Sequence, residues 1–264
     1  MILMRRALTT LIALFAFAAP ALAAEPVVGV WYRGTPAGTP KQEELAVIRA
    51  LGFGAITWPA SQTAGLESLK AMAATAGLQV TVAAQPKPVT PASLLAPSER
   101  LDLIVTPQSV DALTALTWRA VARGARIIMF DSGAPQGAGL ENADRSLKPW
   151  VRAAIDVARQ FSANIRLIKS LRPGPGVIVT PDLTPALDVV MIDADRAWML
   201  IATNASPNPV TATVRLPAGT AYAIWVDLLD ATTLAMNGEF AGPKWSLKMA
   251  PRSARVYVID KVMK

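Results

Sequence analysis

TWRAVARGARIIMFDSG, residues 117–133, is the stretch that decides the fold class. It begins as a helix rich in small residues, turns at Arg123-Gly124-Ala125, and continues as an apolar strand that stops at Asp131. A helix that leads directly into a buried strand is the repeating unit of α/β proteins with a parallel sheet. Ligands of such folds gather where the strands end. The stretch therefore predicts an α/β fold with a site near Asp131.

The same alternation runs from Val27 to about Leu171. Apolar runs predict strands at 27–32, 55–58, 78–83, 101–105 and 126–130, and periodic stretches predict helices at 40–52, 66–76, 110–123 and 147–171. These are five strands in about 145 residues, whereas a complete eight-stranded barrel needs about 250. The pattern therefore predicts either an abbreviated (β/α) barrel of the TIM type or an open sheet, and it does not choose between them.

The pattern of apolar and turn residues changes after Arg172-Pro173-Gly174-Pro175-Gly176, a Pro/Gly cluster typical of a domain boundary. Beyond it, short apolar runs alternate with turn sequences such as Ser206-Pro207-Asn208-Pro209. This pattern predicts a small antiparallel β-sandwich. We therefore expect a signal peptide over residues 1–24, a barrel-like domain over 25–172 and a sandwich domain over 177–264.

The first 24 residues have the pattern of a secretory signal peptide. Arg5 and Arg6 supply the charge, an uncharged apolar run covers 7–19, and Ala21-Leu22-Ala23 offers a cleavage site. An uncleaved membrane anchor is the alternative, although the apolar run is short for a span. We expect a secreted or periplasmic protein with no stable membrane span after cleavage.

The composition excludes several kinds of chemistry. The chain has 0 Cys and 0 His, which excludes disulfides, the usual zinc ligands and every His-dependent triad. We therefore expect no metal and no cofactor. The formal charge of +7 comes from scattered residues, which indicates a solvated surface rather than a nucleic-acid face.

Three segments, taken in order, resemble the β-galactosidase type of clan A glycoside hydrolases. The first is similar to their opening strand and the helix that follows it, the second to their final helix and strand, and the third to their trailing β-sandwich. The residues are Gly29–Gly34 with Glu44–Gly54, Arg119–Phe130, and Trp198–Asn204 with Leu216-Pro217 and Met249–Val256. The resemblance implies a barrel followed by a sandwich, and it covers about two-thirds of the mature chain.

The resemblance also implies two catalytic glutamates, which in retaining enzymes lie about 5–5.5 Å apart. This sequence has no Asn-Glu dipeptide after a central strand, and Thr106-Pro107-Gln108 follows the strand where the nucleophile would stand. If Gln108 takes that place, it cannot form a glycosyl ester. The central strands and the usual carboxylate pair are therefore expected to be missing.

The remaining candidate residues lie at the ends of predicted strands. Trp31 and Trp58 could stack on sugar rings or pack in the core. Asp131 could bind sugar hydroxyls or act as a lone acid/base, but it could also cap the following turn. Arg33 could bind a carboxylate or a uronic acid, although a surface role is favoured, and Gln108 is a further candidate for substrate binding.

Two acidic residues, Glu141 and Asp144, follow the glycine-rich stretch 132–139. The stretch matches no phosphate-binding motif and indicates a rim loop. The two acids could serve the N-terminus of the next helix. They could also form a displaced catalytic pair with Asp131.

These observations favour a degenerate, exported glycoside-hydrolase-like protein that binds a saccharide or a cell-envelope glycan at Trp31, Trp58, Asp131, Arg33 and Gln108. Two alternatives stay open. One is an active glycosidase that pairs Asp131 with Glu141 or Asp144, and the other is a non-enzymatic envelope scaffold. The sequence identifies neither the sugar nor a protein partner.

Overall fold

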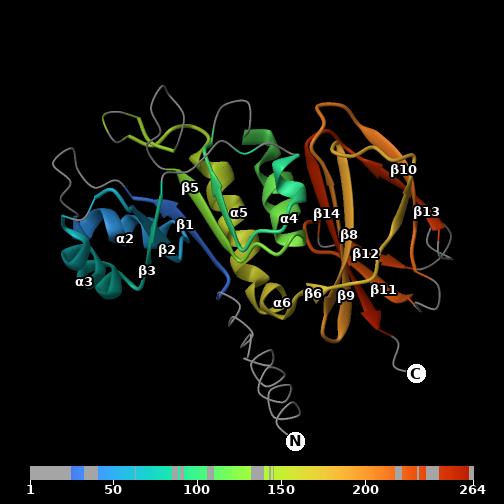
Figure 1. Ribbon diagram of the computed structural model, residues 1–264, viewed down its shortest axis with the longest axis horizontal. Helices are drawn as coiled ribbons and strands as arrows, with labels where there is room; N and C mark the ends of the chain where they lie inside the picture. The colour runs from blue at the N-terminus through green and yellow to red at the C-terminus, as the bar shows by residue number, and fades with distance from the viewer. Residues whose placement is uncertain are drawn as a thin grey trace, which may run out of the picture.

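The computed structural model of the 264-residue chain describes residues 25–32, 41–62, 64–84, 89, 92–105, 110–131, 140–142, 144, 146–217, 222–230, 232–235 and 244–261. An α/β part reaches to about Leu171, and a part made of antiparallel sheets follows it; the two lie side by side (Figure 1). The predicted signal peptide, Arg33, Gln108 and the glycine-rich stretch 132–139 lie outside the described residues.

The α/β part contains one parallel sheet of five strands, which confirms the expected mixed α/β class. Its order is β3-β2-β1-β5-β4, so β3 and β4 stand at the two edges. The strands are β1 (Val27–Trp31), β2 (Ala55–Pro59), β3 (Gln79–Ala83), β4 (Arg100–Leu103) and β5 (Ile127–Asp131). The predicted strand positions are confirmed to within two residues, and β5 ends at Asp131 as expected.

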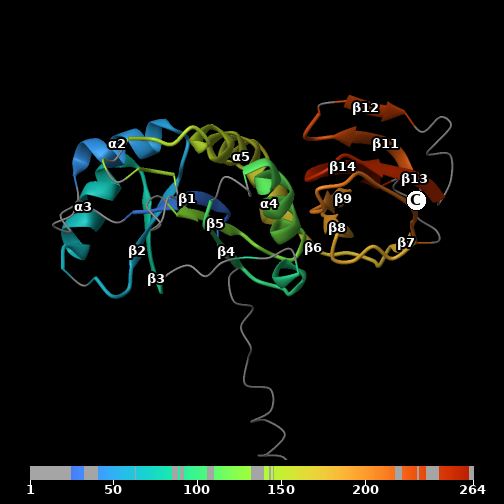
Figure 2. The ribbon, with the colours of Figure 1, turned by 90° about the horizontal axis from the view of Figure 1, so that it is seen from above.

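Helices lie along one side of this sheet (Figure 2). They are α2 (Gln42–Ala50), α3 (Leu66–Ala76), α4 (Leu113–Ala122), α5 (Val151–Ala163) and α6 (Ile165–Ser170), with short 3₁₀ turns at Ser93–Leu95 and Val110–Ala112. Gly77 ends α3 at φ 71°, in the left-handed conformation that glycine adopts most readily.

One helix prediction was wrong. The continuous helix expected over 147–171 begins only at Val151 and is interrupted at Asn164. Before it, Leu147 is extended and pairs with Glu141 in an isolated bridge. At the break, the Asn164 side chain donates to the carbonyl of Gln160, which occupies a backbone acceptor of the last turn of α5.

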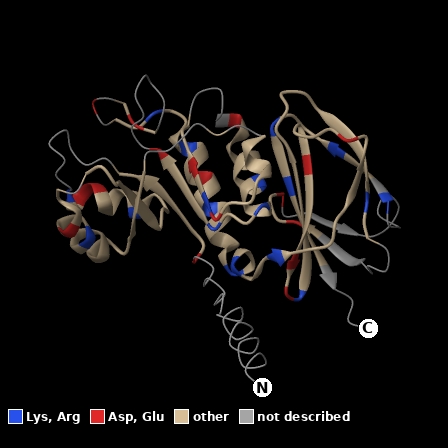
Figure 3. Cartoon of the chain, viewed as in Figure 1, with Lys and Arg blue, Asp and Glu red and all other residues tan. Residues whose placement is uncertain are grey.

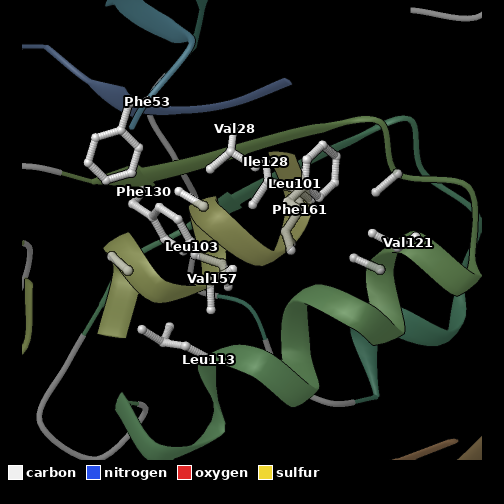
Figure 4. Packing of buried hydrophobic residues seen from close by; sticks show 14 of the residues in the cluster. Val28, Phe53, Leu101, Leu103, Leu113, Val121, Ile128, Phe130, Val157 and Phe161 are labelled. Carbon is white, nitrogen blue, oxygen red and sulfur yellow. The ribbon is translucent and has the colours of Figure 1, made fainter. Parts of the chain in front are cut away.

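The two faces of the parallel sheet differ in character because neighbouring residues of a strand point to opposite sides. The face toward the helices is apolar and packs against α4 and α5 (Figure 4). The labelled side chains come from the strands, from the turn before β2 and from the two helices. On the sheet side they are Val28, Phe53, Leu101, Leu103, Ile128 and Phe130, and on the helix side Leu113, Val121, Val157 and Phe161. We call the opposite side the inner face; in the described residues no helix covers it.

The sheet is strongly curled around its inner face. Four strand spacings of about 4.8 Å would separate the edge strands of a flat sheet by roughly 19 Å. In the structure, Arg100 Nη1 of β4 lies 3.2 Å from Thr81 Oγ1 of β3. One side chain therefore spans from one edge strand to the other.

The second part consists of two antiparallel sheets that share an apolar cluster, which includes Met191, Leu200, Val214 and Leu247. One sheet has the order β13-β10-β7 and the other β12-β11-β14-β9-β8-β6. The strands are β6 (Arg172–Pro173), β7 (Ile178–Thr180), β8 (Leu187–Ala194), β9 (Ala197–Asn204), β10 (Val210–Arg215), β11 (Tyr222–Asp227), β12 (Thr232–Ala235), β13 (Lys244–Met249) and β14 (Ser253–Lys261).

Helix α4 joins the two parts, because it packs on the parallel sheet and also contacts β8, β9 and β14. Arg119 of α4 is fully buried. It donates to Thr203 Oγ1 at 2.9 Å, to Thr203 O at 3.0 Å, to Pro185 O at 2.7 Å and to Ala186 O at 3.0 Å. One helix turn later, Arg123 forms an ion pair with Asp188 at 2.6 Å.

Charged residues are spread over both parts of the chain (Figure 3), as the scattered sequence positions predict. Among the described residues, no helix is long and apolar enough to cross a membrane.

Candidate functional site

The inner face carries a network of polar side chains from four strands. Its centre is Asp102 of β4, whose Oδ1 accepts the indole N–H of Trp31 from β1 at 2.7 Å. Arg100, two residues earlier in β4, donates to the same carboxylate through Nε and Nη2, at distances from 2.8 to 3.1 Å. The guanidinium also lies over the Trp31 ring, 5.7 Å from its centroid. These contacts hold Asp102 in one orientation.

Two threonines complete the network. Arg100 Nη2 donates to Thr57 Oγ1 of β2 at 2.7 Å, and Nη1 reaches Thr81 Oγ1 of β3. The two hydroxyls lie 2.8 Å apart and are hydrogen-bonded to each other. We refer to Trp31, Thr57, Thr81, Arg100 and Asp102 as the inner-face network.

The local sequence explains why these side chains meet. In Arg100-Leu101-Asp102-Leu103 the two leucines are buried toward the helices, so the charged residues between them point to the inner face. The register pairs Trp31 with Thr57 and Thr57 with Thr81, which places the three side chains in one row across the sheet. The curl of the sheet then brings β4 over this row.

A half-open cavity of about 430 Å³ adjoins the network along the free edge of β4. Its wall includes Arg100 and Asp102, the end of β3 at Ala83, and the segment from Ser93 to Ser98. The side chains of Arg100 and Asp102 remain 22% and 21% exposed. The network is therefore open to a ligand of small-molecule size.

Asp131 and Trp31 lie next to each other on the inner face, because the register of β1 and β5 pairs them. Trp31 and Asp131 are each only 1% exposed. The structure therefore brings these two predicted site residues together, at the C-terminal end of the sheet. Their ligand-binding roles remain predictions.

Trp58 follows Thr57 in β2 and therefore points to the face that the helices cover. It is completely buried, its indole N–H donates to Gln62 O at 2.5 Å, and its ring lies 6.0 Å from that of Tyr32. The structure thus separates Trp58 from Trp31 by the thickness of the sheet. A role for Trp58 in binding remains a prediction, and it would require access from the helix side.

The other two acidic candidates lie outside the network. Glu141 lines a cavity of about 260 Å³ together with Tyr32, Glu43 and Glu44 beside α2. Asp144 accepts hydrogen bonds from the hydroxyl and backbone N–H of Ser146, and these lower the pKa of Asp144. A carboxyl with a lowered pKa is ionised at neutral pH and is poorly suited to donate a proton.

The inner-face network suits recognition better than proton transfer or metal binding. The Asp102 carboxylate forms an ion pair with the Arg100 guanidinium, which also donates to the hydroxyls of Thr57 and Thr81. The charges of Asp102 and Arg100 therefore nearly cancel. Among the described residues no group of three or more acidic side chains is arranged to hold a metal ion. Sequence reasoning missed Arg100, Asp102, Thr57 and Thr81. The alternation of charged and leucine residues in β4 was the signal that could have found the first two.

No family model and no curated protein matches this chain. Solved structures similar to it include an α-amylase from Anoxybacillus (10% identity, TM-score 0.45, covering 84% of this chain and 56% of the amylase). Another is a GH27 β-L-arabinopyranosidase from Geobacillus stearothermophilus, in complex with arabinose (8%, TM-score 0.42, 84% and 62%). A third is a family 30 subfamily 8 xylanase from Clostridium acetobutylicum (13%, TM-score 0.36, 88% and 55%).

These solved structures are glycoside hydrolases, and this chain spans less than two thirds of the length of each. At such low identity and TM-score the similarity carries no argument about activity.

Proposed function

We propose that this chain is an exported, glycoside-hydrolase-like protein that binds a neutral saccharide at the inner-face network without hydrolysing it. The parallel sheet is proposed to be an abbreviated barrel, and the antiparallel sheets its trailing sandwich. The main observation behind this proposal concerns Asp102, whose carboxylate lies at the mouth of a cavity. Hydrogen bonds from Arg100 and Trp31 fix the orientation of this carboxylate.

The geometry of Asp102 favours binding of hydroxyl groups. Within the described part of the chain, its Oδ1 accepts hydrogen bonds from both Arg100 and Trp31, whereas its Oδ2 accepts only from Arg100 Nε at 2.9 Å. Each carboxylate oxygen has two lone pairs, so Oδ2 retains a position for a ligand hydroxyl. Because Arg100 compensates the charge, the site favours a neutral polyol over an acidic sugar.

The same geometry disfavours hydrolysis. Glycoside hydrolysis needs two carboxyl groups with distinct roles on either side of the scissile bond. The register places only two acidic residues, Asp102 and Asp131, on the inner face of the five strands. Asp102 is committed to Arg100 and Trp31, which leaves Asp131 without a second carboxyl group that is available for proton transfer.

The test is a binding and turnover screen of the mature chain against a panel of neutral oligosaccharides. Trp31→Phe keeps an aromatic ring but removes the indole N–H, and Asp102→Asn removes the charge. Each is expected to weaken saccharide binding by about tenfold, the size of one charge-assisted hydrogen bond. Asp156→Asn on the exposed side of α5 is the matched control and should bind as the parent does.

Three other outcomes would overturn the proposal. Hydrolysis that vanishes in Asp131→Asn would show an active glycosidase with a displaced pair that includes Glu141 or Asp144. Unchanged affinity in Trp31→Phe and Asp102→Asn would place the saccharide elsewhere, and Trp58→Phe would then test the helix side. No binding to any sugar would favour the envelope scaffold.

A further inference from the structure

We propose a second binding site, in the groove between the two parts of the chain, for an oxyanion attached to a short apolar body. A cavity of about 290 Å³ lies where the α4–β5 turn, the linker at Leu171–Gly174 and strand β8 meet. Three arginines, Arg123, Arg126 and Arg172, line it, and the lining includes no acidic residue.

Arg126 provides the strongest argument for an anion. Its side chain is only 8% exposed, and its two hydrogen bonds go to backbone carbonyls, those of Ala125 at 3.1 Å and Leu171 at 3.0 Å. Among the described residues it forms no ion pair with a carboxylate. Burial lowers the pKa of Arg126, and the charge of Glu99 partly offsets this effect. A buried charge is costly unless an opposite charge accompanies it, and an anion in the groove would supply that charge.

The other two arginines differ in their availability. Arg123 donates to Asp188 through Nη2 at 2.6 Å and Nε at 3.3 Å. Its charge is therefore already compensated, and it lines the groove without being available to an anion. The Arg172 side chain makes no hydrogen bond or ion pair with the described residues, and it is exposed. Arg172 is therefore available to a ligand that also contacts Arg126 in the groove.

The rest of the groove is apolar. Val121 and Leu171 contribute from the α/β part, and Val190 and Met191 contribute from β8. An adjoining cavity of about 350 Å³ shares Arg123 and Arg126 but adds Glu99, so an anion is favoured on the β8 side. Guanidinium groups next to apolar walls suit a carboxylate or phosphate with a short alkyl or aryl group.

The residues that test this site differ from those that test the saccharide proposal. Arg123 lines both the groove and the cavity beside the inner-face network, whereas Arg126 and Arg172 line the groove and not that cavity, and Trp31 and Asp102 do not line the groove. Each can therefore be tested without the other.

The experiment is isothermal titration of the full mature chain with hexanoate, hexyl phosphate, inorganic phosphate and hexanol. Hexanoate and hexyl phosphate should bind, and hexanol should bind at least about tenfold more weakly because it carries no charge. Inorganic phosphate should bind more weakly than hexyl phosphate, because it lacks the apolar body. A preference between the two hexyl anions identifies which oxyanion the groove takes.

Substitutions then locate the site. Arg172→Gln and Arg126→Met should each weaken hexanoate and hexyl phosphate by about fivefold or more, as expected for a lost charge-assisted contact. Arg166→Gln is the matched control, because Arg166 is exposed on α6 and does not line the groove. Equal affinity for hexanoate and hexanol, or an unchanged affinity in Arg172→Gln, would overturn the proposal. If Arg126→Met does not fold, Arg172→Gln still tests the proposal. The Arg172 side chain makes no hydrogen bond or ion pair with the described residues, so replacing it should not affect folding.

Discussion

At the scale of single residues, Tyr257 links the fold to pH. Its side chain is 5% exposed, and burial raises its pKa from 10.0 to about 12, with the charge of Asp227 adding to the effect and that of Arg255 opposing it. A phenol whose pKa is raised on folding favours the folded state fully below the unfolded pKa, and this contribution is lost as the pH rises through the folded value.

We therefore expect the free energy of unfolding to fall between pH 10 and 12 by about 1.4 kcal/mol per pH unit from this residue. Urea unfolding at a series of alkaline pH values measures the slope. Tyr257→Phe should flatten it, and a slope that persists in this variant would contradict the assignment.

The inner-face network also belongs to this scale, and it shows what the sequence could and could not predict. Asp131 was predicted at the end of its strand, because an apolar run that stops at a polar residue is visible in one dimension. The contact between Trp31 and Asp102 was not predicted, because it joins residues 71 positions apart. That contact depends on how strongly the sheet is curled, and the curvature of a sheet cannot be predicted from a local sequence pattern.

At the scale of elements, β1 is the strand on which the parallel sheet is centred, and Gly29 lies in its middle. A Cβ atom at Gly29 would lie 2.1 Å from Ala55 O and 2.9 Å from Met129 Sδ. The close approach of β1 to β2 therefore requires glycine at this position.

Gly29→Ala is expected to lower the free energy of unfolding by about 2 kcal/mol, because it forces two paired strands apart. Gly176→Ala is the matched control, because no atom lies within 4 Å of its added Cβ. Urea midpoints of the two variants give the comparison. A Gly29→Ala midpoint equal to that of the control would show that β1 and β2 can separate freely.

Elements were predicted better than their arrangement. The strands from Val27 to Asp131 follow from apolar runs between Gly and Pro signals. The break at Asn164 escaped the helix pattern, because its cause is a hydrogen bond from one side chain to Gln160. Likewise, the placement of Trp31 and Trp58 on opposite faces depends on strand parity and register, which become visible only once the strands are paired.

At the scale of the whole molecule, Arg119 connects the two parts. Its guanidinium is desolvated, which lowers the pKa of Arg119, and it donates four hydrogen bonds to described residues of the antiparallel part. Removing it would leave the carbonyl groups of Pro185, Ala186 and Thr203 with one donor fewer each.

We expect the parent chain to unfold in one transition and Arg119→Met to lose about 3 kcal/mol of stability. Far-ultraviolet circular dichroism and tryptophan fluorescence, followed together in urea, should coincide for the parent and diverge for the variant as the parts uncouple. Arg166→Met on the surface should change stability by less than about 0.5 kcal/mol. Diverging curves in the parent itself would show that the parts are already independent.

The unclosed sheet also bears on how copies of the chain meet one another. Strands β3 and β4 end the sheet order, so each presents backbone groups that no further strand of that sheet pairs. Free edges of this kind promote strand addition between molecules, and charged side chains on an edge strand oppose it. Arg100 and Asp102 stand on one of these edges. The residues that shape the proposed saccharide site thus also protect the protein from self-association, and a substitution there trades ligand affinity against solubility.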